Sequence, residues 1–353
     1  MSDPTEGPFT FEELQLATRN RGMPLEALAY DVTPTGLHYL LVHFDIPVIE
    51  LSAWQLSVGG AVKHPLTLSL SDLKARPSVT LTVTLECAGN GRTQLSPRPV
   101  SQPWIHEAIG TAQWTGTPLA PVLEEAGLAA DTVELVFTGA DHGIQDDAEH
   151  DYARSLKVTE AMAPDVLLAY EMNGGPLEPQ HGYPLRLVVP GWYGMASVKW
   201  LTRIEAVTKP FQGYQQTGSY RYSRDADDPG APVERIRVRA LMIPPGYPHF
   251  LSRERVLPSG RTNLRGRAWS GHAPVTRVEV GVDGIWSDAT MDPPIAEHAW
   301  RGWSYLWEAR PGEHNLTCRA TDASGAVQPQ DPPWTYGGYG NNATQKIAVT
   351  VRS

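Results

Sequence analysis

Apolar and polar residues alternate in two different ways along the chain, and the change falls near residue 225. Before it, strand-like runs with a period of two lie between short segments that begin at helix-capping residues and end at glycine or before proline. The predicted helices cover 10–22, 71–76 and 118–126, and the predicted strands cover 79–85, 133–137 and 185–189. This mixture predicts an irregular α+β domain.

The helix ends in this first half are marked by recognisable capping residues. Thr10 and Glu13 have the spacing of a capping box at the start of the first helix, and Gly22 suits its C-terminal cap. Ser71 begins the second helix, and Gly127 closes the third. These positions give the helix predictions a physical basis at both ends.

After residue 225 the pattern predicts strands only. Residues 223–232 are polar and rich in Asp, Gly and Pro, as expected for a linker. Turns at Asp283-Gly284 and Ser324-Gly325 separate some of the later strands. The predicted strands cover 236–242, 262–269, 276–282, 304–309, 315–321 and 346–351. The sequence therefore predicts two domains, 1–225 and 226–353, the second an all-β immunoglobulin-like sandwich.

Composition narrows the range of partners and compartments. The 353 residues carry a formal net charge of −10, which disfavours nucleic acid or an anionic membrane as the main partner. No run of about 18 apolar residues is present, and the N-terminus MSDPTEGPFTFEEL lacks the features of a signal peptide. We expect a cytoplasmic protein, or a mature periplasmic form if a leader is missing. Cys87 and Cys318 lie too far apart in the pattern for us to expect a disulfide.

The segment around Cys87 is the strongest candidate for chemistry. A predicted strand runs into Cys87, and Gly89, Asn90 and Gly91 then offer a turn that tolerates positive φ and close approach. Arg92 brings a permanent positive charge, which would lower the thiol pKa and favour a thiolate suited to a soft metal. Two other interpretations stay open from the residues alone: a small buried core cysteine on an ordinary turn, or a nucleophile.

Two further stretches gather polar and aromatic side chains. His181, Arg186 and Lys199 lie among glycine-rich turns, where three donors can hold a phosphate. Their simpler interpretation is a hydrogen-bonded turn histidine and two surface charges beside strands. Residues 214–222 end the first domain and contain three tyrosines, among them Tyr220. The simpler interpretation of that segment is packing between the domains.

Taken together, these stretches resemble the sulfite oxidase family from about Tyr39 to Val351. The family's metal-binding cysteine lies in a Cys-Ala-Gly-Asn-x-Arg motif, which corresponds to 87–92 here. Further resembling segments follow in the family's order: Leu-Ala-Tyr-Glu-Met-Asn-Gly at 168–174, the segments 181–186 and 198–201, Ala-Trp-Ser-Gly at 268–271 and Val-Gln-Pro at 327–329. The resemblance implies a molybdenum-cofactor domain followed by a dimerisation sandwich.

The resemblance also implies roles for individual residues. Cys87 is the implied molybdenum ligand, Arg92 lies beside the substrate, and Tyr220 corresponds to an active-site tyrosine. The implied contacts to the molybdopterin and its phosphate are Leu41, Val42, His43, Phe44, Asp45, Asp141, His181, Arg186, Ser197, Val198 and Lys199.

The substrate side departs from the family pattern at three positions. His43 and Gly337 stand where the family has arginines, and Ser219 replaces an aspartate before Tyr220 in a segment one residue longer. A pocket with His43 in place of arginine is expected to lose positive charge as pH rises past about 6.5. The alternative for His43 is a neutral ring packed and hydrogen-bonded beneath the pterin.

The implied reaction is oxidation of sulfite to sulfate, with no haem in this chain and an external acceptor such as a basic c-type cytochrome. A homodimer is implied by the sandwich. Two competing functions remain: a molybdenum enzyme that reduces nitrate or a sulfoxide, and a metal-free binding protein built on the sandwich.

Overall fold

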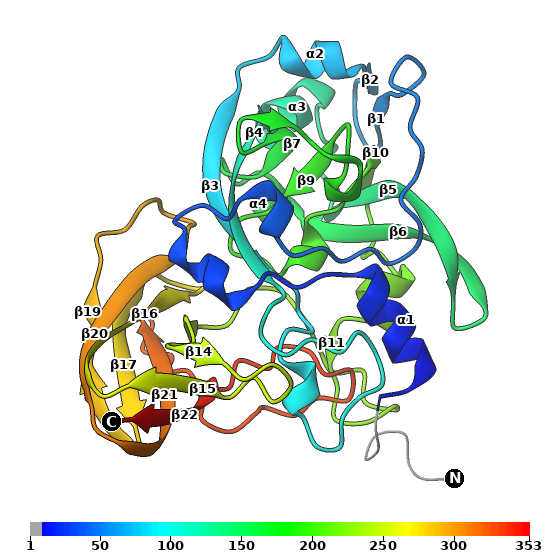
Figure 1. The fold of residues 1–353 in the computed structure, drawn as a ribbon. Helices are drawn as coiled ribbons and strands as arrows, with labels where there is room; N and C mark the ends of the chain where they lie inside the picture. Colours follow the sequence, from blue (N-terminus) through cyan, green and yellow to red (C-terminus); the bar gives the residue numbers. More distant parts are fainter. Residues whose placement is uncertain (1–8) are drawn as a thin grey trace.

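The computed structural model describes residues 9–353, and Figure 1 shows them as two units packed against each other. The expectation that no signal peptide is present rests partly on residues 1–8, which lie outside the described part. Among the described helices, none is long and apolar enough to cross a membrane.

The first unit contains two five-stranded sheets. One has the order β2-β1-β10-β5-β6, with β1 and β10 parallel; the other has the order β3-β4-β7-β8, with β9 beside β7. The strands are β1(Leu56–Gly60), β2(Leu66–Leu68), β3(Val79–Glu86), β4(Ile109–Pro118), β5(Glu134–Gln145), β6(Ala148–Lys157), β7(Leu167–Met172), β8(Gly175–Pro176), β9(Arg186–Val188) and β10(Leu201–Val207). A large apolar core that includes Leu56, Phe137 and Leu201 fills this unit.

Short helices connect these strands. The α-helices are α1(Phe11–Arg19), α2(Leu70–Lys74), α3(Leu119–Ala126) and α4(Val158–Ala161). The single-turn helices are η1(Leu25–Ala29), η2(Thr35–Leu37), η3(Arg92–Gln94), η4(Pro179–His181), η5(Gly194–Ala196) and the π-turn η6(Tyr214–Gly218).

The predicted helix ends are partly confirmed. Thr10 and Glu13 form the capping box of α1, and Gly127 closes α3 with a φ of 66°. The predicted end at Gly22 is wrong, because α1 stops at Arg19 and its C-cap is Asn20 in an extended conformation. The predicted start at Ser71 is also wrong, since Ser69 caps α2 through a capping box with Asp72.

The second unit is a sandwich of two sheets with the orders β13-β16-β20-β19 and β14-β15-β22-β21-β17-β18. Its strands are β13(Arg239–Met242), β14(Tyr247–Pro248), β15(Arg255–Pro258), β16(Gly260–Trp269), β17(Val275–Val282), β18(Ile285–Asp288), β19(Thr290–Met291), β20(Arg301–Ala309), β21(Gly312–Asp322) and β22(Lys346–Arg352). The pattern predicted all the long strands and missed the short strands β14, β15, β18 and β19. The predicted architecture, a mixed domain followed by an all-β sandwich, is confirmed, although the chain is mostly β with short helices.

The two units share a third apolar cluster. It joins Met23 and Leu28 near the N-terminus to Tyr220 and to Trp269 and Trp300 of the sandwich strands and their loops. The predicted linker is not plain coil, because β11(Arg221–Tyr222) pairs with β12(Ala231–Pro232) across it. The division at residue 225 stays a prediction.

Candidate active site

Strand β3 ends at Glu86 and delivers Cys87 to a tight turn. The Cys87 amide donates to the Ala108 carbonyl at 2.9 Å, and the Cys87 carbonyl accepts from the Asn90 amide at 3.0 Å. Cys87 packs against Trp104 and Ala108 and is 7% exposed, at the wall of a pocket. It is therefore buried at a cavity and not within a closed core.

The turn needs its glycines for two different reasons. Gly91 has a φ of 91°, whereas Gly89 and Asn90 have no positive φ, so the expectation of left-handed freedom holds at Gly91 alone. A Cβ atom at Gly89 would lie 2.6 Å from the Arg92 guanidinium. One at Gly91 would lie 2.9 Å from the Asn341 amide. The groups that approach this backbone closely are therefore the protein's own side chains.

Without a bound metal, the Arg92 charge is not sufficient to deprotonate the Cys87 thiol. Burial raises the pKa of the Cys87 thiol, and this exceeds the lowering by the Arg92 charge. The Arg92 charge lowers the thiol pKa as expected, but this effect does not give a thiolate because burial outweighs it. A bound metal cation is the group able to hold a deprotonated sulfur here.

One pocket with an empty volume of about 610 Å³ brings together nine of the residues proposed for the site. They are Leu41, His43, Cys87, Asp141, His181, Arg186, Ser197, Lys199 and Tyr220. The pocket also contains residues that the pattern did not single out, among them His38, Tyr39, Tyr152 and Gln180. The position of His38 and Tyr39 directly before the 41–45 loop was the only sequence signal for them.

The wall of this pocket is built around a buried arginine. Arg186 donates to the His181 carbonyl at 3.1 Å and to the Ser197 carbonyl at 3.2 Å, and its Nε has no partner in the protein. Burial lowers the pKa of Arg186 to about 10, so it stays charged at neutral pH. Lys199 donates to the Leu41 carbonyl at 2.7 Å. The interpretation of Arg186 as a surface charge is wrong.

Three more of the residues that line this pocket have a buried polar atom without a partner. The Nε2 atoms of His38 and His181 and the Oδ1 atom of Asp141 are buried and make no hydrogen bond within the protein. Burial raises the pKa of Asp141 and lowers that of Lys199, and the opposite charge of the other residue partly offsets each shift. Buried polar groups without partners are rare, so this group indicates that a polar ligand completes the wall.

Tyr220 and His43 meet on the substrate side. His43 Nε2 lies 2.5 Å from the Tyr220 hydroxyl, and its ring lies 4.6 Å from that of Tyr152. Tyr220 has a φ of 54°, which a tyrosine adopts only where the surrounding structure holds it. Burial, with a smaller effect of Lys199, lowers the pKa of His43 to about 3. The expectation that His43 titrates near 6.5 is therefore wrong; its neutral ring is hydrogen-bonded to Tyr220, and a hydrogen bond to the pterin stays a prediction.

Two further arginines lie behind this part of the pocket. Arg92 donates to the Gly337 carbonyl at 3.3 Å and to the Gln102 carbonyl at 3.0 Å, and it does not line the pocket. Arg154, which the pattern missed, lies with its guanidinium carbon 5.6 Å from the centre of the Tyr220 ring. It is 2% exposed and its Nε has no partner.

The remaining proposed residues do not line the pocket. Val42 is buried and its amide donates to the Asn20 side chain at 2.7 Å, while Val198 lies in the main core. The Phe44 ring lies against Gly143. Asp45 faces solvent and pairs with Arg19 at 2.9 Å. These four residues support the loop or strand that carries their neighbours.

Two family profiles match the chain. "Oxidoreductase molybdopterin binding domain" matches residues 43–215, and "Mo-co oxidoreductase dimerisation domain" matches residues 232–352. The first includes Cys87, Asp141, His181, Arg186 and Lys199 of the pocket, and the second covers the sandwich. The fold and the site therefore define a molybdopterin-dependent oxidoreductase.

Individual proteins also match nearly the whole length of this chain. The chain is 34% identical to mitochondrial sulfite oxidase of Mus musculus, covering 91% of this chain and 62% of that protein, so it spans less than two thirds of this relative's length. It is 34% identical to sulfite oxidase of Gallus gallus, with coverage of 90% and 73%, and 30% identical to NADH nitrate reductase of Solanum lycopersicum, with coverage of 94% and 40%. The sulfane dehydrogenase SoxCD of Paracoccus pantotrophus has a similar structure, with a TM-score of 0.81 over 100% of this chain and 95% of the matched chain, at 25% identity. This chain belongs to the sulfite oxidase family.

The pocket fits the family's cofactor on structural grounds. A molybdopterin needs a cationic cradle for its phosphate, hydrogen-bonding partners for its pterin edges and a soft ligand for its metal. Arg186 and Lys199 provide the charge, Asp141 and His181 have unpaired atoms, and the Cys87 sulfur lies at the same cavity.

Proposed function

We propose that this chain oxidises sulfite to sulfate and passes two electrons, one at a time, to an external acceptor such as a c-type cytochrome. In the balanced reaction, sulfite and water give sulfate, two protons and two electrons. The observation that carries the proposal is that Cys87, Tyr220 and the charged wall share one pocket. Identity of 34% to sulfite oxidases across about nine tenths of the chain supports the choice of substrate.

When bound, the cofactor supplies the two-electron chemistry at its metal. The protein's part begins with Cys87, whose thiolate would hold the metal at the end of β3. Arg186 and Lys199 would hold the phosphate by charge-assisted hydrogen bonds. Asp141 and His181 would bind polar edges of the pterin through the atoms that have no protein partner.

Tyr220 and His43 would act on the substrate side. The Tyr220 hydroxyl can donate to an anion while neutral His43 holds its orientation from 2.5 Å away. Burial raises the pKa of Tyr220 well above its usual range, so the phenol keeps its proton and serves as a donor. The Arg154 charge behind the ring makes the hydroxyl a stronger donor. Arg92 would act on the same side, through its fixed charge near the cysteine turn.

Two other reactions have specific support. The likeness to a sulfane dehydrogenase favours a sulfur-chain substrate, and the likeness to nitrate reductase favours nitrate reduction. A neutral His43 and Gly337, where the resemblance expects arginines, leave less charge to bind a dianion. Steady-state assays of one preparation with sulfite and an artificial one-electron acceptor, with a sulfane compound, and with nitrate and a reduced dye distinguish the three. Highest kcat/KM with nitrate or the sulfane compound would overturn the proposal.

We also propose a homodimer formed through the sandwich. The support is the match of residues 232–352 to a dimerisation domain and three large apolar side chains exposed near β14, Tyr247, Phe250 and Leu251. Exposed apolar groups of this kind mark association surfaces. Sedimentation of the wild type should give a dimer. A monomer at micromolar concentration would contradict the assignment.

The net charge of −10 supports a basic acceptor protein. Electrostatic attraction between opposite charges raises the association rate and weakens with salt. The rate of cytochrome reduction should therefore fall as ionic strength rises, while turnover with a small neutral acceptor stays constant.

A further inference from the structure

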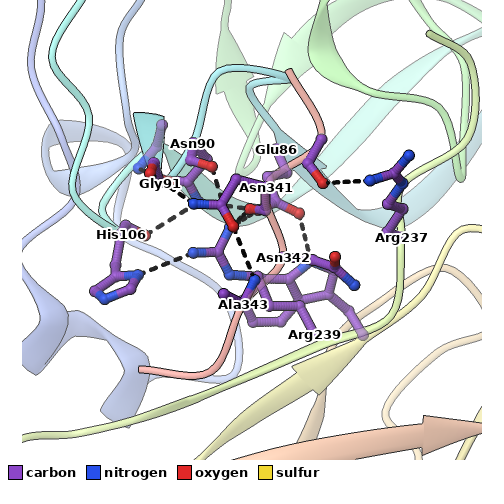
Figure 2. Close-up of polar contacts among 12 residues, drawn as sticks. Glu86, Asn90, Gly91, His106, Arg237, Arg239, Asn341, Asn342 and Ala343 are labelled. Atoms are coloured by element: carbon purple, nitrogen blue, oxygen red, sulfur yellow. Dashed lines mark hydrogen bonds and ion pairs between the residues drawn. The ribbon is translucent and has the colours of Figure 1, made fainter. Parts of the chain in front are cut away.

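The carboxylate of Glu86, next to Cys87 in the chain, is bound mainly by the sandwich. It is 1% exposed and accepts from the Arg239 guanidinium at 2.8 Å and from the Trp269 indole at 2.8 Å. Arg239 begins β13 and Trp269 ends β16. The third donor, the side-chain amide of Asn90 at 2.9 Å, belongs to the cysteine turn itself, residues 87–92. Figure 2 shows Arg239 reaching Glu86 and Asn90.

Arg239 makes several contacts around the base of the turn. It donates to the Asn341 carbonyl at 3.1 Å and to His106 Nδ1 at 2.9 Å. Burial, together with the Arg239 charge, lowers the pKa of His106 to about 3, so its ring stays neutral and accepts this bond. Arg239 is 1% exposed, and all the hydrogen bonds above come from its two terminal nitrogens, while its Nε atom has no partner in the protein.

A second set of contacts comes from the loop before β22. The Gly340 amide donates to the Ala88 carbonyl at 2.7 Å, and the Asn341 side chain donates to the Gly91 carbonyl at 2.7 Å. Arg237 in turn donates to the Gly340 carbonyl at 2.8 Å. Two backbone carbonyls of the turn are thus bound by residues more than 200 positions away.

We propose that Glu86 and Arg239 are a positioning pair through which the sandwich sets the place of the Cys87 sulfur. The catalytic consequence rests on the proposed role of Cys87 as a metal ligand, but the positioning itself does not. Neither residue lines the pocket. They act through the turn, because the chain leaves Glu86 directly into Cys87 and Asn90 bridges back to Glu86. The sandwich thereby becomes part of the active-site support as well as an association domain.

The charges of the pair depend on each other. Glu86 and Arg239 form a buried ion pair with 2.8 Å between Arg239 and the carboxylate, in which each charge compensates the other. Removing one partner leaves an unpaired buried charge, whereas removing both charges together does not. Glu86→Gln with Arg239→Met is therefore the variant expected to keep the fold while it loses the ion pair and the other Arg239 contacts to the turn.

Arg267 provides a matched control. It is a buried arginine on β16 that also links the sandwich to the first unit, donating to the Leu28 carbonyl at 2.8 Å and pairing with Asp31 at 2.9 Å. The residues that it contacts lie 56 or more positions from Cys87 in the chain. It makes no contact with the cysteine turn. Arg267→Met tests the loss of an interdomain arginine without loss of the turn's support.

The test measures how fast Cys87 reacts with an aromatic disulfide reagent in the cofactor-free full-length chain. A Cys318→Ala background leaves Cys87 as the single thiol, since the chain has two cysteines. Arg239→Met, and the double variant Glu86→Gln/Arg239→Met, should react at least roughly tenfold faster than the parent, because opening of the turn costs less free energy. Arg267→Met should react within about twofold of the parent on the same reasoning.

The loaded enzyme gives a second readout. The double variant should unfold near the parental temperature, yet lose kcat with little change in KM, because the metal ligand moves while the substrate contacts remain. Labelling in the double variant as slow as in Arg267→Met would overturn the positioning role. That result is independent of Cys87→Ser, whose full activity would instead overturn the proposed function.

Discussion

The two cysteines of this chain lie in different surroundings: Cys318 in an apolar core and Cys87 at a polar pocket. Cys318, on β21, is wholly buried between the sandwich sheets, with Val280 and Leu316 among its apolar neighbours. Cys87 lies at a cavity lined by His38 and His181, whose Nε2 atoms are buried and have no partner in the protein. Both thiols are free, and burial raises the pKa of each. Their own chemistry is thus similar, and the surrounding groups differ.

The comparison shows which region needs a bound ligand to complete its hydrogen bonds. An apolar core is complete when its side chains pack, so Cys318 needs nothing further. A cluster of buried donors and acceptors without partners is costly unless another molecule supplies them. The Cys318 region is therefore stabilised by its packing, whereas the Cys87 pocket is expected to be stabilised by its ligand.

The largest effect is expected from replacing the pocket cysteine. Cys87→Ser should lower turnover by more than roughly 100-fold, beyond the loss typical of residues that only hydrogen-bond to a metal ligand, because it removes the proposed protein ligand of the metal. It should retain some pterin, since Arg186 and Lys199 remain. Turnover and bound pterin are measured on the same preparation.

Cys318→Ala is the matched control in the other region. It should leave turnover near normal and cost about 1 kcal/mol of unfolding free energy, because a small core group is lost. Equal losses of turnover in the two variants would remove the contrast on which the assignment depends.

The next effect concerns the phosphate anchor. Arg186→Met should weaken cofactor retention by roughly tenfold to a hundredfold, the range of one hydrogen bond to a charged group. Retention is followed as molybdenum remaining per chain after repeated buffer exchange. Arg319→Met, at a sandwich arginine that pairs with Glu279 at 2.7 Å, should retain the wild-type amount. Equal metal loss in both variants would argue against an anchor.

Tyr220 should affect turnover without affecting metal content. Tyr220→Phe removes the hydroxyl that meets His43 and should lower kcat by roughly tenfold to a hundredfold, as for loss of a proton donor. Tyr222→Phe, two residues further and outside the pocket lining, should stay close to wild type. If metal falls in proportion to activity in Tyr220→Phe, the tyrosine is structural.

The smallest effect is a pH dependence of stability. His43 has a pKa of about 3 in the fold against 6.5 in a free chain, so the unfolded state binds more protons between these values. Its contribution to stability is complete above pH 6.5 and is lost as pH falls towards 3, by up to about 1.4 kcal/mol per pH unit.

His43→Gln removes that proton uptake. Denaturant unfolding at pH 7.5, 5.5 and 4.5 should show a smaller loss of stability in the variant than in the wild type. The wild-type KM for sulfite should also show no inflection from His43 between pH 5 and 8. Identical stability slopes in the two proteins would mean that His43 is not buried neutral.

The sequence predicted those parts of the molecule that depend on local patterns. Strand β3, the caps Thr10 and Gly127, and the long sandwich strands follow from alternation and capping chemistry that adjacent residues carry. The ends at Gly22 and Ser71 were mispredicted, because α1 ends earlier, at an Asn20 in extended conformation, and Ser69 caps α2 through a capping box with Asp72.

The rest of the site depends on contacts between distant residues. Burial of His43, which sets its pKa, comes from packing against Tyr152 and Tyr220 more than 100 positions away. Arg154 sits on a strand that shows no motif, and Arg239 reaches Glu86 only because the sandwich folds back onto the cysteine turn. No periodicity in one chain encodes such juxtapositions.

The most direct test of the central claim is the molybdenum content of the purified protein. The chain is produced in a host that makes the cofactor, and metal is measured by plasma mass spectrometry with released pterin measured in parallel. The account predicts about one molybdenum per chain with matching pterin, as expected for a single soft-ligand site. Active protein that contains neither molybdenum nor pterin would contradict it.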